Sequence, residues 1–139
     1  NFMEKIAIIT DDGKRISRHF GRATHYLVVT IEDGLETGRE LRPKPGHQHF
    51  VGQQGQHDDH AHGEGQRHGF DPESQNRHFQ MASVIQDCSL LICGGMGMGA
   101  YDGMKSANIR PIVTDLWDID QALQAYLAGT LQDRTDLLH

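Results

Sequence analysis

A run of glycines follows an apolar segment near residue 93, and together these two features could bind an anion. Residues 88–93 (Cys-Ser-Leu-Leu-Ile-Cys) are typical of a buried strand, and residues 94–100 are Gly-Gly-Met-Gly-Met-Gly-Ala. A helix is predicted next, over residues 100–108. A glycine turn at a helix start exposes backbone N–H groups at the positive end of the helix dipole, so it suits a negatively charged ligand. A tight turn without a ligand is the alternative.

The spacing of these glycines differs from two common phosphate-binding motifs. After Gly97 and Gly99, the dinucleotide fingerprint G-x-G-x-x-G fails because the third glycine comes one residue late, at Gly103. A P-loop needs Gly-Lys followed by Ser or Thr, and the sequence contains no such triplet. The glycines alone therefore do not indicate a nucleotide.

A second candidate is a basic stretch that ends in His-Phe-Gly-Arg-Ala at residues 19–23. His19 could ligate a metal or donate an N–H group. Arg15, Arg18 and Arg22 bring positive charge to a chain whose formal net charge is −6. A loop histidine beside solvated arginines is the alternative. If the stretch joins the first two predicted strands, it lies at the same end of the sheet as the glycine turn.

A third candidate is a segment rich in Gly, Gln, His and Asp at residues 46–70. Its histidines are dense enough to bind Zn²⁺, Ni²⁺ or Cu²⁺, although their spacing matches no structural zinc motif. They are His47, His49, His57, His60, His62 and His68. Because this composition cannot bury enough apolar surface, we expect a mobile insertion, which could recruit metal, cover the anion site or be only a solvated loop.

Sulfur-bearing residues flank the glycine turn. Cys88 and Cys93 are five positions apart, so on one strand they would face opposite sides. We expect Cys88 in the core, and Cys93 either in the core or at the mouth of the site. A covalently held iron–sulfur cluster would need about four cysteines. Met96 and Met98 could offer polarizable contacts to a ligand or be ordinary loop or core residues.

The elements that must position these residues follow from periodicity and turn signals. Strands are predicted at 4–10, 25–32, 35–42, 88–93 and 109–113, with Asp33-Gly34 as a hairpin turn and the third strand at a sheet edge. One helix starts at Asp71-Pro72 and runs to about Gln86, with Phe79, Ala82 and Ile85 on its buried face. Asp118 should cap a last helix. The order β-β-β-α-β-α-β-α predicts an α/β fold: one domain, residues 3–132, with a mixed five-stranded sheet and helices packed on it.

Bulk composition excludes some classes of function. A net charge of −6 does not favour nucleic-acid binding. No apolar stretch approaches the roughly 20 residues that span a membrane, and the N-terminus enters a predicted strand directly, without the pattern of a signal peptide. Two cysteines do not make a disulfide framework, so we expect a cytoplasmic, reducing setting.

The two motifs together resemble a known family. His19-Phe20-Gly21-Arg22-Ala23 after Asp12-Gly13, followed later by Cys93-Gly94-Gly95-Met96-Gly97, is similar to the dinitrogenase iron–molybdenum cofactor-binding family, across nearly all of the chain outside 46–70. The resemblance implies a ribonuclease-H-like fold and binding of an anionic metal–sulfide cluster, iron–molybdenum cofactor-like or molybdenum–copper sulfide, without catalysis. It also implies that His19 is the protein ligand or hydrogen-bond donor, and that other proteins donate or accept the cluster.

The predicted cluster site joins the two motifs. Its residues are Arg18, His19, Phe20, Gly21, Arg22, Gly94, Gly95, Met96, Gly97 and Met98, with His47, His49, His57, His60 and His62 as further metal ligands. One alternative is a Zn, Ni or Cu chaperone or sensor that acts through the His-rich segment. Another is a hydrolase using Asp11 and Asp12, which we disfavour because the first strand carries no carboxylate over residues 5–9.

Overall fold

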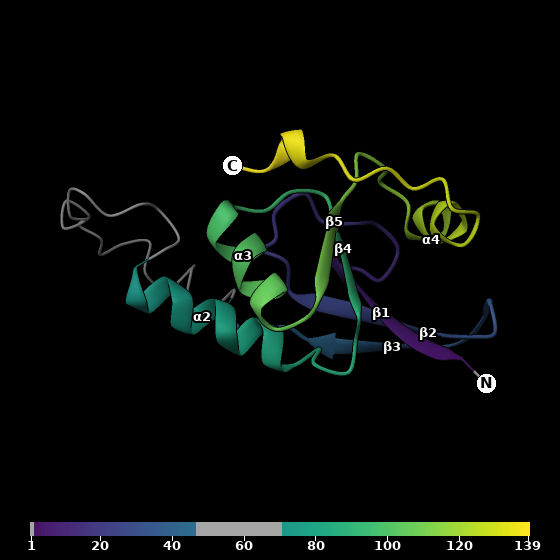
Figure 1. The fold of residues 1–139 in the computed structure, drawn as a ribbon, viewed down its shortest axis with the longest axis horizontal. Helices are drawn as coiled ribbons and strands as arrows, with labels where there is room; N and C mark the ends of the chain where they lie inside the picture. The colour runs from purple at the N-terminus through teal and green to yellow at the C-terminus, as the bar shows by residue number, and fades with distance from the viewer. Residues whose placement is uncertain (1, 47–70) are drawn as a thin grey trace.

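The computed structural model describes residues 2–46 and 71–139 (Figure 1). The mobility expected for the His-rich segment, and the metal ligands expected there from His47 to His68, lie outside the described residues. The described elements, in chain order, are β1 (Met3–Thr10), β2 (His25–Glu32), β3 (Leu35–Pro43), α2 (Pro72–Ser83), β4 (Leu90–Cys93), α3 (Met98–Ser106), β5 (Arg110–Val113), α4 (Ile119–Leu127) and the short 3-10 helix η2 (Thr135–Leu137).

The strands form one five-stranded sheet in the order β3-β2-β1-β4-β5. β1 pairs antiparallel with β2 and parallel with β4, β2 pairs antiparallel with β3, and β4 pairs parallel with β5. The prediction of an α/β fold with a mixed five-stranded sheet and β3 at an edge is confirmed. Since β3 runs in the same direction as β1, the carboxyl ends of β1, β3, β4 and β5 all lie at one end of the sheet.

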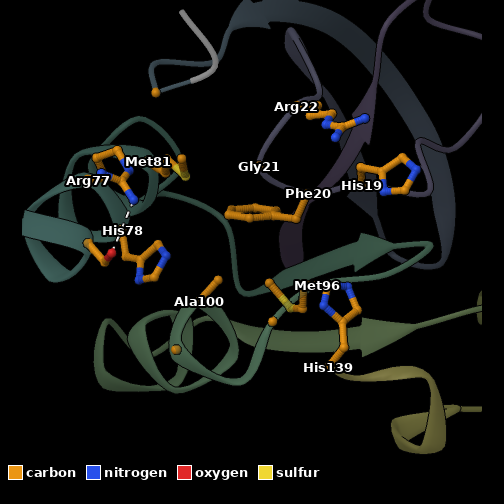
Figure 2. A pocket seen from close by; sticks show the side chains of 14 residues that line it. His19, Phe20, Gly21, Arg22, Arg77, His78, Met81, Met96, Ala100 and His139 are labelled. Atoms are coloured by element: carbon orange, nitrogen blue, oxygen red, sulfur yellow. Dashed lines mark hydrogen bonds between the residues drawn. The ribbon is translucent and has the colours of Figure 1, made fainter. Parts of the chain in front are cut away.

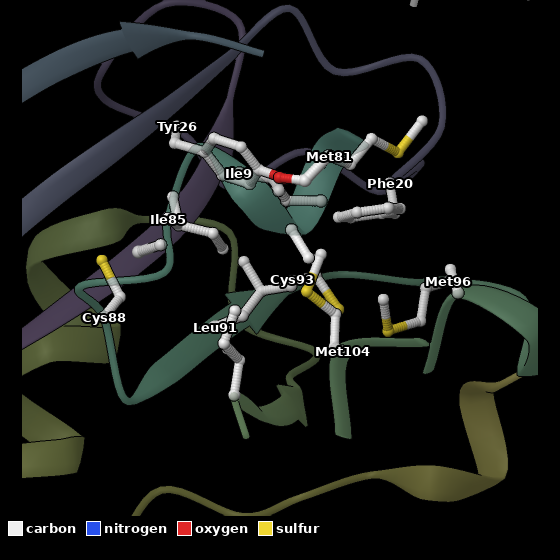
Figure 3. Packing of buried hydrophobic residues seen from close by; sticks show 14 of the residues in the cluster. Ile9, Phe20, Tyr26, Met81, Ile85, Cys88, Leu91, Cys93, Met96 and Met104 are labelled. Atoms are coloured by element: carbon white, nitrogen blue, oxygen red, sulfur yellow. The ribbon is translucent and has the colours of Figure 1, made fainter. Parts of the chain in front are cut away.

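The alternation of side chains along the strands builds a hydrophobic core on each face of the sheet. Ala7 and Ile9 belong to the core that includes residues of α2 and α3, whereas Ile6 and Ile8 belong to the core that includes residues of α4. The molecule therefore has three layers, with α2 and α3 on one face and α4 on the other (Figure 1). Figure 3 shows the first core, in which Tyr26 of β2 and Met81 of α2 meet.

The helix starts follow the predicted capping chemistry. Asp71 accepts a hydrogen bond from Ser74 N at 3.2 Å, and Asp118 accepts one from Gln121 N at 2.9 Å, so both predicted N-caps are confirmed. Within residues 2–46 and 71–139, no helix combines the length and the apolar character that crossing a membrane requires.

The two cysteines correct one prediction, because they lie in the same core rather than on opposite faces (Figure 3). The strand begins at Leu90, so Cys88 belongs to the turn before it, and strand alternation does not apply to the pair. Both thiols are free and buried.

The predicted buried face of α2 is confirmed in part. Ala82 and Ile85 are buried as expected, whereas Phe79 is 66% exposed, and Met81 is buried as well. The helix ends at Ser83 rather than near Gln86. The hydroxyl of Tyr26 donates to Met81 O at 2.8 Å, and Arg42 Nη1 donates to Val84 O at 2.8 Å. These side chains from the sheet satisfy carbonyls at the end of the helix, where backbone partners are lacking.

Candidate anion-binding site

A pocket of about 260 Å³ lies at the carboxyl end of the sheet, and we call it the edge pocket. It is formed by the loop after β1, the start of α3, one side of α2 and the last residue, as Figure 2 shows. Its lining residues are His19, Phe20, Gly21, Arg22, Gly46, Ser74, Arg77, His78, Met81, Met96, Gly97, Gly99, Ala100 and His139. The structure thus brings both predicted motifs to one pocket, but not every residue of each.

Backbone hydrogen bonds fix the loop that carries His19. Gly94 N donates to Ser17 O at 3.0 Å, and Phe20 N donates to Gly95 O at 3.1 Å. The loop also folds on itself, because Arg22 N and Ala23 N both donate to His19 O at 3.1 Å. His19 is therefore presented on a backbone that is held from two sides.

The buried glycines at 94 and 95 allow this close approach. A Cβ atom at Gly95 would lie 2.5 Å from the backbone oxygen of Arg18, and one at Gly94 would lie 2.4 Å from the Arg18 guanidinium carbon. Neither glycine is among the residues that line the edge pocket. Their role in this structure is to let the β1 and β4 loops touch.

Arg18 does not line the edge pocket. Its guanidinium lies 4.6 Å from the ring centroid of Trp117 and donates to the backbone oxygens of Ile16, Thr114 and Leu116. Burial lowers the pKa of Arg18 from its usual value. The side chain thus joins the loop after β1 to the loop after β5. Met98 is also absent from the lining and is 40% exposed.

The edge pocket is electropositive in an acidic chain. Its lining includes two arginines and three histidines, and none of its described lining residues is an aspartate or glutamate. Gly99 and Ala100 belong to the first turn of α3, where the N-cap, Gly97, offers no side-chain acceptor and the N–H group of Met98 donates to His139 O. The first turn is also the positive end of the helix dipole, which attracts negative charge. This lining therefore suits an anion.

Two thioethers and an aromatic ring give the pocket a soft surface. Met81, Met96 and Phe20 line it and are each at most 3% exposed (Figure 2). Behind Phe20, the ammonium of Lys44 lies 4.7 Å from the ring centroid and donates to Ala23 O at 3.3 Å. Burial lowers the pKa of Lys44 to about 8, an effect that the nearby Asp11 partly opposes.

The two cysteine thiols are poorly suited to ligate a metal from this site. Burial raises the pKa of Cys88 and of Cys93 to about 12. The thiolate is the form that binds metals, and both thiols are buried and absent from the lining of the edge pocket.

The acidic residues after β1 support the loop. Asp12 accepts from the backbone N–H groups of Lys14 and Arg15 at 2.8 and 2.9 Å, and these bonds lower its pKa. Asp11 accepts from Thr24 N at 3.0 Å. In the part of the chain that the structure describes, no three His, Cys, Asp or Glu side chains gather closely enough to hold a metal ion.

Sequence reasoning missed several lining residues. Arg77 and His78 come from α2, where Arg77 Nη2 donates to Ser74 Oγ at 3.1 Å (Figure 2). Ser74, His78 and Met81 recur at helical spacing on the face that turns inward, a pattern that could have revealed them. His139 carries no such signal, because only the path of the chain after α4 brings it to the pocket.

One comparison with known proteins identifies a family. The family model described as dinitrogenase iron-molybdenum cofactor matches residues 3–129. No match was found among curated proteins.

Solved structures share the fold. The protein PH0822 is 22% identical, with a TM-score of 0.62 over 96% of each chain. A dinitrogenase candidate from Methanocaldococcus jannaschii is 17% identical, with a TM-score of 0.60 over 95% of each chain. The apo form of the orange protein from Desulfovibrio gigas is 18% identical, with a TM-score of 0.60 over 96% of this chain and 94% of that one. At such identities the likeness concerns the fold alone. On the evidence of the family match, the chain belongs to the dinitrogenase iron-molybdenum cofactor family.

Proposed function

We propose that the chain is a carrier that binds an anionic metal–sulfide cluster in the edge pocket and does not transform it. One observation carries this proposal: in a chain with a net charge of −6, the pocket is lined by two arginines, three histidines and the start of a helix. Because none of its described lining residues is acidic, the pocket favours a negatively charged cargo.

The chemistry of such clusters fits the lining. Sulfides are weak hydrogen-bond acceptors, so N–H donors and a polarizable surface suit them, and the pocket offers imidazoles, guanidinium groups and the thioethers of Met81 and Met96. Because both cysteines are buried and neither lines the edge pocket, we assign the protein ligand or donor to nitrogen, first of all to His19. We infer a cluster of the iron–molybdenum cofactor type or a molybdenum–copper sulfide.

The proposal extends to the setting in which the carrier works. A carrier needs one protein that supplies the cluster and another that accepts it, and the two free cysteines support a reducing, cytoplasmic setting. We keep the ribonuclease-H-like description of the fold as part of the proposal.

Cluster content is the direct test. The protein is purified without oxygen from its native host, and molybdenum, iron, copper and acid-labile sulfide are measured together with the visible absorption. We expect metal and sulfide in fixed ratio to the protein. Preparations that carry neither metal nor sulfide, and that take up no thiometallate when it is added, would contradict the proposal.

Two variants locate the cargo. His19→Ala and Arg22→Gln should each lower retention of the cluster on gel filtration, because each removes a lining donor, while circular dichroism stays unchanged since both residues are exposed. Arg110→Gln is the matched control, because it removes an exposed arginine that does not line the edge pocket. Equal losses in Arg22→Gln and Arg110→Gln would mean that only overall charge matters.

A further inference from the structure

The chain after α4 returns to the carboxyl end of the sheet, and residues 133–139 are here called the C-terminal segment. Val113 N donates to Asp133 Oδ1 at 3.0 Å, and Arg134 N donates to Val113 O at 2.7 Å. The Arg134 guanidinium pairs with Asp115 and Asp136 at 2.8 Å each. These contacts fix the start of the segment at the end of β5. The whole segment lies beyond residues 3–129, which the family model matches.

The end of the C-terminal segment is held at the start of α3. Leu137 and Leu138 pack against the core that α2 and α3 share. His139 N donates to Met96 O at 3.1 Å, and Met98 N donates to His139 O at 2.8 Å. Met98 is the first residue of α3, so His139 O accepts from an N–H group at the helix start that has no partner within the helix. The backbone of His139 is therefore fixed on both sides.

The imidazole of His139 is directed into the edge pocket, apart from the side chains of α2 (Figure 2). It makes no hydrogen bond to any residue that the structure describes, and the same holds for the imidazole of His19. Both rings are exposed on backbones that hydrogen bonds hold in place. On binding a ligand, such residues lose only side-chain freedom, since their backbone is already ordered.

We infer that His139 is a second imidazole ligand or donor for the cargo, opposite α2 and together with His19. This inference rests on the proposed function. Each ring can donate an N–H group to a sulfide or bind a metal of the cluster through nitrogen. Two imidazoles from distant segments, one after β1 and one at the end of the C-terminal segment, would hold an anionic metal sulfide between them. The C-terminal segment then serves as a wall of the site and supplies a residue that the family match does not include.

Tetrathiomolybdate, a diamagnetic molybdenum sulfide dianion, is the probe. Binding to the full chain is measured by anaerobic equilibrium dialysis, and the imidazole nitrogens are followed by ¹⁵N NMR in histidine-labelled protein. We expect His139→Ala to weaken binding about tenfold, as for loss of one hydrogen bond to a charged group. The ring nitrogens of His139 should shift during the titration of the unmodified chain. His25→Ala, which removes a ring that lies 2.9 Å from Thr24 Oγ1 and outside the pocket, should bind normally.

The outcomes separate this inference from the proposal beneath it. If the unmodified chain binds and His19→Ala weakens binding, but His139→Ala binds normally and the His139 nitrogens do not shift, the inference is wrong and the proposed function stands. If the unmodified chain does not bind the probe and the protein purified from its native host carries neither metal nor sulfide, both are wrong; if it carries a cluster but does not bind the probe, only this inference is wrong. Because the side chain of His139 is exposed, we expect His139→Ala to unfold at the same temperature as the unmodified chain. Equal thermal midpoints then exclude a folding defect as the cause of weaker binding.

Discussion

At the scale of single residues, the fold changes the protonation of Lys44. Lys44 is 1% exposed. Its ammonium lies over the ring of Phe20 and donates a hydrogen bond to the backbone oxygen of Ala23. Burial penalises the charged form, so the pKa falls from 10.5 to about 8. Since Phe20 lines the edge pocket, a cation at this place adds positive charge directly behind the pocket wall.

The lowered pKa of Lys44 predicts a pH dependence of stability. The unfolded chain holds this proton more tightly than the native protein does, so the free energy of unfolding rises with pH between about 8 and 10.5. Relative to Lys44→Met, the unmodified protein should gain about 1 kcal/mol between pH 7.5 and pH 9. Urea unfolding of both proteins at the two pH values measures this gain.

The comparison with Lys44→Met also removes the effect of the cysteines. Their raised pKa values act in the other direction, because the unfolded thiols ionise first as the pH rises above about 9. Both proteins contain Cys88 and Cys93, so this effect cancels in the difference. Parallel pH profiles for the two proteins would show that Lys44 is not the group that titrates.

At the scale of elements, the contact between the loops after β1 and β4 positions the site. A Cβ atom at position 95 would overlap the backbone oxygen of Arg18, which cannot rotate away as a side chain can. The hydrogen bond from Phe20 N to Gly95 O lies at the same contact. Any separation of the loops therefore also moves His19.

Gly95→Ala should lower the free energy of unfolding by about 1–3 kcal/mol, as for other overpacked sites, and weaken tetrathiomolybdate binding. Gly38→Ala is the control, because nothing lies within 4 Å of its Cβ position and β3 is a sheet edge. We expect the control to stay within about 0.5 kcal/mol of the unmodified protein. Urea unfolding and dialysis test both variants. A Gly95→Ala protein as stable as the control would mean that the loops separate at no cost.

At the scale of the whole molecule, the topology concentrates positive charge at one end of an acidic chain. The arginines of the edge pocket come from the loop after β1 and from α2, and its histidines come from these two elements and from the C-terminal segment. A carrier that uses the edge pocket depends on these arginines and histidines. The alternative function, divalent-metal binding, depends instead on the histidines of the His-rich segment.

Replacing all six histidines of that segment with asparagine separates the two functions. The variant changes His47, His49, His57, His60, His62 and His68 and keeps the chain length. We expect tetrathiomolybdate affinity to stay within about twofold, because the described cations of the edge pocket are unchanged, and Zn²⁺ affinity by calorimetry to be lost. A strong loss of tetrathiomolybdate binding would bring the segment into the cluster site, and unchanged Zn²⁺ binding would exclude these histidines as ligands.

The sequence by itself determined the five strands and the three α-helices that the structure describes, their order and two of the contributors to the pocket. Periodicity, the hairpin turn and the caps Asp71 and Asp118 are local signals, so strands and helix starts were predictable. The His19 loop and the glycine turn were identified because each follows a predicted strand. The sequence pattern predicts that the whole glycine turn faces the ligand.

Only the tertiary structure decided which of these residues meet in the pocket. It buried Gly94 and Gly95 against Arg18, placed both cysteines in one core, and ended α2 at Ser83, where Tyr26 and Arg42 donate to nearby carbonyls. It also brought His139 to the start of α3, more than a hundred residues from His19. Contacts between segments so distant in the chain depend on how complete layers pack, and no local pattern of residue types encodes them.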